Sequence, residues 1–136
     1  MRYETFLGQV QARARLNGPG AAETATRASL ETLAERVPAT LAENLAAQLP
    51  REVGEHLRRV AHAPDEPSSG VRMSNQEFFD RVARRAGADR SEAAYEARCV
   101  IEVVDEATGG TCSAKLRPVL DDELARVLFA GSSGQP

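Results

Sequence analysis

The stretch Phe6-Leu7-Gly8-Gln9-Val10 has a counterpart later in the chain, Phe78-Phe79-Asp80-Arg81-Val82, with apolar residues at corresponding positions. After the loss of one loop residue the shared register continues in the pairs Leu30 and Ile101, Leu45 and Leu116, Leu49 and Leu120, and Leu57 and Leu128. Apolar positions that stay in step this long are typical of an internal repeat. The sequence therefore predicts two similar units.

Each unit is expected to form four helices. In the first unit Phe6, Val10 and Ala14 recur at the spacing of one helix face. Alanine is abundant and strand-forming residues are scarce, which favours helix throughout the chain. We therefore expect an all-α protein of about eight helices, with the two units packed as a pseudo-symmetric helical bundle.

Proline, glycine and serine mark the expected boundaries. We predict a first helical repeat at 1–62, a linker at 63–73, a second repeat at 74–130 and a flexible tail at 131–136. Pro118 falls inside the expected seventh helix, which should therefore be short or kinked.

Helix starts are marked by side chains that can accept a hydrogen bond from a free backbone N–H. The segments Ser74–Glu77 and Asp89–Glu92 have the spacing of a capping box, the second with Asp in place of Ser or Thr. Thr40, Thr111 and Asp121 are expected to cap the third, seventh and eighth helices.

Three motifs resemble a known family. They are the N-terminal segment Tyr3–Val10, the helix end Leu33–Pro38 and the corner Leu45–Pro50. Together they resemble the bacterial domain-of-unknown-function family 2267, whose members are short all-helical proteins, often internally duplicated. The resemblance implies the fold but no activity, because none is assigned to the family.

Composition disfavours several function classes. Aromatic residues make up only 4% of the chain, which makes a large cavity lined by aromatic residues unexpected. The net charge of -3 argues against a general nucleic-acid binder, which normally has an excess of basic residues. No secretory signal or membrane span is recognisable, so we expect a cytoplasmic protein without membrane association. Cys99 and Cys112 should then be reduced thiols.

Recognisable catalytic or metal-binding patterns are absent from the sequence. His56 and His62 are six residues apart, which does not align them on one helix face, and no Cys-x-x-Cys motif accompanies Cys99 or Cys112. Both histidines are expected at the surface. No nucleophile motif or glycine-rich phosphate loop occurs. We therefore expect neither enzymatic activity nor a metal or cofactor.

Two groups of arginines form the candidate interaction face, Arg51, Arg58 and Arg59 in the first unit and Arg81, Arg84 and Arg85 in the second. The competing interpretation is a solvated surface with ion pairs one helical turn apart, such as Glu55 with Arg59.

The absence of recognisable chemistry favours a non-enzymatic helical interaction or scaffold module, of a kind that could serve a bacterial stress or regulatory system. Its partner would be another protein or a second copy of the chain. One alternative is a nucleic-acid-associated regulator that uses the helix with Arg51, Arg58 and Arg59, although the negative net charge disfavours it. Another is a thiol redox sensor at Cys99 or Cys112.

Overall fold

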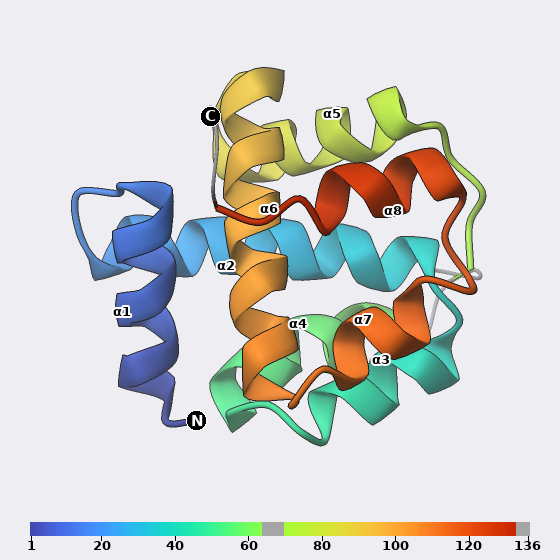
Figure 1. The fold of residues 1–136 in the computed structure, drawn as a ribbon, viewed down its shortest axis with the longest axis horizontal. Coiled ribbons are helices and arrows are strands. Elements are labelled where there is room, and N and C mark those ends of the chain that lie inside the picture. Colours follow the sequence, from blue (N-terminus) through green and yellow to red (C-terminus); the bar gives the residue numbers. More distant parts are fainter. Residues whose placement is uncertain (64–69, 133–136) are drawn as a thin grey trace.

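The structure is a computed structural model that describes residues 1–63 and 70–132. Within these residues the chain forms eight α-helices and no strand (Figure 1). The helices are α1 (Tyr3–Ala14), α2 (Pro19–Arg36), α3 (Ala39–Ala46), α4 (Arg51–Ala61), α5 (Asn75–Ala86), α6 (Arg90–Ala107), α7 (Thr111–Leu116) and α8 (Asp122–Leu128). The predicted all-α class is confirmed.

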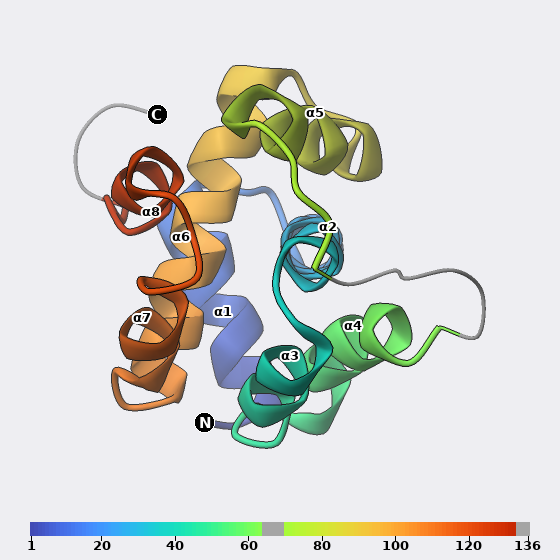
Figure 2. The same cartoon turned by 90° about the vertical axis from the view of Figure 1, so that its right-hand side faces the viewer.

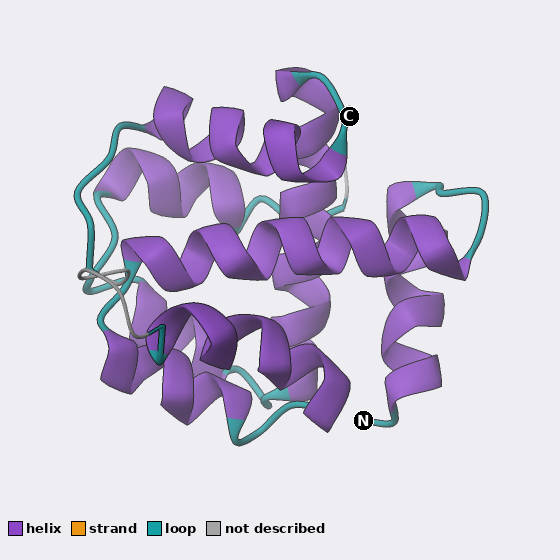
Figure 3. Cartoon of the chain, turned by 180° about the vertical axis from the view of Figure 1, so that it is seen from behind, coloured by secondary structure: helices purple, strands orange, loops and turns teal. Residues whose placement is uncertain are grey.

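Helix α2 is the central element. It packs against α4 on one side and α5 on the other, and these three helices lie side by side on one face of the molecule (Figure 3). Helix α6 crosses α2 on the opposite face, where α7 and α8 also pack against α6 (Figures 1 and 2). Helix α1 contacts both α2 and α6.

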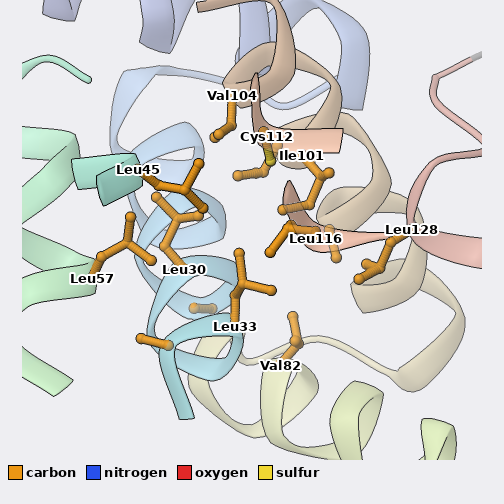
Figure 4. Packing of buried hydrophobic residues seen from close by; sticks show 14 of the residues in the cluster. Leu30, Leu33, Leu45, Leu57, Val82, Ile101, Val104, Cys112, Leu116 and Leu128 are labelled. Carbon is orange, nitrogen blue, oxygen red and sulfur yellow. The ribbon is translucent and has the colours of Figure 1, made fainter. Parts of the chain in front are cut away.

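One continuous hydrophobic core joins all eight described helices. Leu30 of α2 lies beside Leu45 of α3, and Leu33 of α2 points toward Leu116 of α7, with Val82 of α5 close by (Figure 4). The two predicted repeats therefore share a core rather than forming separate bodies. Burial of large aliphatic side chains in such a core is the main stabilising contribution to a fold of this kind.

The helix lengths of the two halves run in parallel. They are 12, 18, 8 and 11 residues from α1 to α4, and 12, 18, 6 and 7 residues from α5 to α8. Helix α7 ends at Leu116, before Pro118, as expected for a residue that cannot continue the hydrogen-bond ladder. The equivalence of the two halves remains a prediction.

Part of the expected linker packs against the end of α2. Gly70 N donates to Val37 O at 2.9 Å, Val71 N donates to Glu35 O at 2.8 Å, and Met73 is buried. The rest of the expected linker, residues 64–69, lies outside the described residues. Four residues of the expected tail, 133–136, also lie outside them.

The capping predictions were partly correct. Asp89 and Glu92 form a complete capping box, and Asp121 accepts from Leu124 N at 2.8 Å. At Ser74 only half of the box forms, because the Glu77 side chain pairs with an arginine instead. The caps predicted at Thr40 and Thr111 were wrong. Pro38 and Gly110 occupy the cap positions, two residues before Thr40 and one residue before Thr111, so each threonine lies within its helix.

Helices α3 and α4 approach each other closely at Gly54. An added Cβ at this position would lie 2.8 Å from Ala46 O and 3.2 Å from Ala46 Cα. Because these are backbone atoms, no side-chain movement can make room. The absence of a side chain at Gly54 therefore sets the distance between the two helices.

Candidate functional site

The six predicted arginines lie on α4 and α5, which flank α2 on one face of the molecule (Figure 3). The structure brings three of them together, Arg59, Arg81 and Arg85, through carboxylates of α2. Arg58 turns toward α3, and Arg51 and Arg84 are exposed. The six predicted arginines thus fall into three groups: those paired with carboxylates of α2, one that faces α3, and two that are exposed without an ion pair to the described residues.

On α4, neighbouring arginines bind different helices. Arg58 Nε lies 3.1 Å from an Oε atom of Glu43 on α3, and His62 contacts the same carboxylate at 3.0 Å. Arg59 Nη2 lies 3.0 Å from Glu31 Oε2 on α2 and donates to His56 Nδ1 at 2.6 Å. The structure therefore pairs Arg59 with Glu31 of α2, where the sequence suggested a partner on the same helix.

On α5, Arg85 and Arg81 share the carboxylate of Glu35. Arg85 donates to both carboxylate oxygens at 2.8 Å and to Thr32 Oγ1 at 2.8 Å, and Arg81 donates to Glu35 Oε1 at 3.1 Å. Arg81 also pairs with Glu77. Burial opposes ionisation of the Glu35 carboxyl, but the hydrogen bonds from Arg85 and Arg81 outweigh it and hold its pKa below the usual range.

Glu31 connects the two arginine groups across α2. Its carboxylate lies 3.0 Å from Arg59 of α4, 3.4 Å from Arg85 of α5 and 3.7 Å from Arg27 of its own helix. Glu31 and Glu35 are four residues apart, so both carboxylates project from the same side of α2. This spacing is visible in the sequence, but it indicates partners for the arginines only once α2 is known to lie between α4 and α5.

Arg84 differs from its neighbours because it is exposed and has no hydrogen bond or ion pair to the described part of the chain. Together with Arg81, Arg85 and Glu35 it lines a surface hollow of about 230 Å³. Arg51, at the start of α4, is also exposed and unpaired among the described residues. Of the six predicted arginines, these two have guanidinium groups available to an outside partner.

The expectation of two surface histidines was wrong for His56. This side chain is buried, with a relative exposure of 8%, where α4 packs on α2. Burial and then the positive charge of Arg59 lower its pKa, which favours the neutral ring. His62 is exposed as expected, with 62% of its side chain accessible, and faces Glu43.

Both cysteines are free and buried. Cys112 belongs to the main core, where burial raises the pKa of its thiol to about 12. Cys99 lies with Ala14 and Tyr95 in a smaller cluster between α1 and α6, and burial raises the pKa of this thiol also. A buried thiol with a raised pKa is a poor nucleophile.

The described surface offers few features of other site types. Within residues 1–63 and 70–132, Met1 is the one large apolar side chain that is exposed, and no three His, Cys, Asp or Glu side chains are grouped as metal ligands would be. No helix in the same part of the chain is both long and apolar enough to span a lipid bilayer. The most distinctive surface feature is therefore the charged face of α4, α2 and α5.

These features define a small all-α protein with a single core and a charged face built on three adjacent helices. A family model described as "Uncharacterized conserved protein (DUF2267)" matches residues 3–127. The chain belongs to the DUF2267 family, as the resemblance in its sequence predicted. A search of curated proteins found no match.

Proposed function

We propose that the protein is a non-enzymatic helical interaction module that binds an acidic protein surface through the face formed by α4, α2 and α5. The observation that carries this proposal is the charge of the face. It holds the arginines Arg27, Arg59, Arg81, Arg84 and Arg85 and the glutamates Glu31, Glu35 and Glu77. This network and the hollow beside it thus hold five arginines and three glutamates, a local excess of positive charge in a chain whose net charge is -3.

The ion network supports this proposal because it orders the face before a partner arrives. Glu31 and Glu35 fix Arg59, Arg81 and Arg85, so these side chains lose little further conformational entropy on binding. Arg84 projects beside them without a partner in the described chain and can pair with a carboxylate of another protein.

Among the described residues, Met1 is the one large apolar side chain that is exposed, so we expect the contact with a partner to be mainly polar and charged. A predominantly charged interface gains association rate and specificity from electrostatics rather than high affinity from apolar burial. Binding is therefore expected to be reversible and to weaken as salt screens the charges.

Capture of partners from the native cell by three forms of the full chain tests the proposal. They are the unaltered protein, Arg84→Glu, and Lys115→Glu as a matched charge reversal at an exposed residue of α7. We expect a stoichiometric acidic partner that is retained by the unaltered protein and by the Lys115→Glu variant, lost by Arg84→Glu and released by moderate salt. Absence of any such partner, or equal retention by Arg84→Glu, would overturn the proposal.

A nucleic-acid-associated regulator is the second candidate, because the same excess of arginine can contact phosphates. Gel shifts with duplex DNA and RNA at low salt separate the two. Binding that falls steeply with salt and disappears in Arg84→Glu supports this candidate. No shift at low salt removes it.

We further propose that the two halves derive from an internal duplication. The support is the shared apolar register of the sequence and the parallel order of helix lengths, identical for α1 with α5 and for α2 with α6. Superposition of experimentally determined coordinates of the two halves tests it. Crossing angles that differ throughout would contradict a common origin.

A further inference from the structure

The chain after α8 turns back onto α6 and is bound there by polar contacts. Gly131 O accepts from Arg98 Nε at 2.9 Å. Ser132 donates twice to the carboxylate of Glu102, from its Oγ at 2.7 Å and from its backbone N at 3.1 Å. Gly131 and Ser132, which were expected to belong to a flexible tail, are thus anchored on α6. We call these two residues the clasp.

Position 131 favours glycine. Its φ of 77° lies in the left-handed region, which side chains other than glycine rarely adopt. An added Cβ would also clash with Glu102 Oε2, the oxygen that accepts from Ser132 N. A side chain at this position would therefore displace the carboxylate that holds the clasp.

The residues that hold the clasp also hold the end of α1. Glu102 Oε1 lies 2.8 Å from a guanidinium nitrogen of Arg13, and Tyr95 OH donates to Arg13 O at 2.7 Å. The same Tyr95 hydroxyl lies 3.4 Å from Ser132 O. Arg13 makes two further contacts, both 2.7 Å long, with Glu106. The clasp, α1 and α6 therefore meet at two shared side chains, Glu102 and Tyr95.

Beneath these contacts lies the small apolar cluster of Ala14, Tyr95 and Cys99, which is separate from the main core. Tyr95 contacts both the clasp and the Cys99 thiol. Because the cluster is small, its opening exposes little apolar surface and needs far less free energy than global unfolding. Cys112, in contrast, belongs to the main core.

We propose that the clasp is a conformational latch that fixes the end of α1 on α6, and that its release opens this corner of the molecule while the main core stays folded. The latch belongs to the second half of the chain, because it consists of residues that follow α8. Release uncovers the α6 segment that contains Tyr95 and Cys99.

The native thiols report the opening without any added probe site. The full chain is treated with a small thiol-reactive reagent, and modification of each cysteine is followed separately by peptide mass spectrometry. In Gly131→Ala, Cys99 should react roughly tenfold to a hundredfold faster, the factor expected for the loss of about two hydrogen bonds. Cys112 should keep the rate of the unaltered protein.

Two further variants keep the test decisive. Ser132→Ala removes one side-chain bond without strain and should give a smaller acceleration of Cys99 alone. Gly87→Ala places a side chain at another positive φ, 68°, with open space around it, and should not accelerate Cys99 selectively. Unchanged reactivity of Cys99 in both clasp variants would refute the latch, and so would an equal acceleration of both cysteines.

Discussion

Replacement of Gly54 by alanine tests the packing of α3 on α4. The new Cβ would lie 2.8 Å from Ala46 O and 3.2 Å from Ala46 Cα, so one helix must move. Overpacking of this kind costs about 1–3 kcal/mol, and contact with backbone favours the upper end. The higher helix propensity of alanine offsets about 1 kcal/mol. We therefore expect a net loss of roughly 1–2 kcal/mol in the free energy of unfolding.

Gly8 supplies the matched control, because it also lies inside a helix but has open space where a Cβ would be added. Gly8→Ala should gain about 0.5–1 kcal/mol from propensity and reduced unfolded-state entropy. Urea unfolding followed by circular dichroism measures both variants. A Gly54→Ala protein as stable as Gly8→Ala would show that α3 and α4 do not approach as described.

Three further variants address the charged face, a buried histidine and a helix cap. Glu35→Gln should lower the free energy of unfolding by about 1–2 kcal/mol, because an uncharged amide cannot pair with two guanidinium groups. Glu77→Gln, at the exposed edge of the same face, should change this free energy by less than about 0.5 kcal/mol. Equal effects of the two variants in urea titrations would contradict the ion network. Because the pKa of His56 is lowered in the folded state, the unfolded chain binds the proton first, so stability should fall as the pH drops below about 6.5. Urea midpoints at pH 7.5 and 5.5 should differ less in His56→Gln than in His62→Gln, and an unchanged difference would exclude this linkage. Asp89→Ala should cost about 1 kcal/mol through loss of the capping box, measured by the same titration, and no loss would mean that the cap does not hold the start of α6.

Much of the fold could be predicted from local sequence patterns. The apolar spacing of residues such as Phe6 and Val10 identified helix faces, and both are buried. Asp89 and Asp121 were correctly identified as caps, because the backbone donor that each accepts from lies three residues away in sequence. Such features depend on short-range geometry, which a sequence displays directly.

Features that depend on contacts between distant helices could not be read in the same way. Nothing around Gly54 in the sequence reveals that another helix backbone approaches it. His56 lies on α4, most of whose residues are polar or charged, yet packing against α2 buries its side chain. Glu102 and Ser132 are 30 residues apart, so neither indicated that the end of the described chain would be anchored.

The candidate face was predicted in part. The arginines of α4 and α5 were recognised as basic groups, but their proximity depends on α2 lying between the two helices. Glu31, Glu35 and Glu43 pair with four of the six arginines and leave Arg51 and Arg84 exposed and unpaired among the described residues. Only this tertiary arrangement distinguishes side chains that brace the fold from those that remain available for binding.

The central place of α2 has a consequence for synthesis on the ribosome. Nine of its 18 residues are buried, in part by α5 and α6, which are translated later. Until residues 75–107 have emerged from the ribosome, the side of α2 that α5 and α6 cover stays exposed and can contact other chains. The first half of this protein thus needs α5 and α6 to bury its central helix, and its folding is completed only after they have been translated.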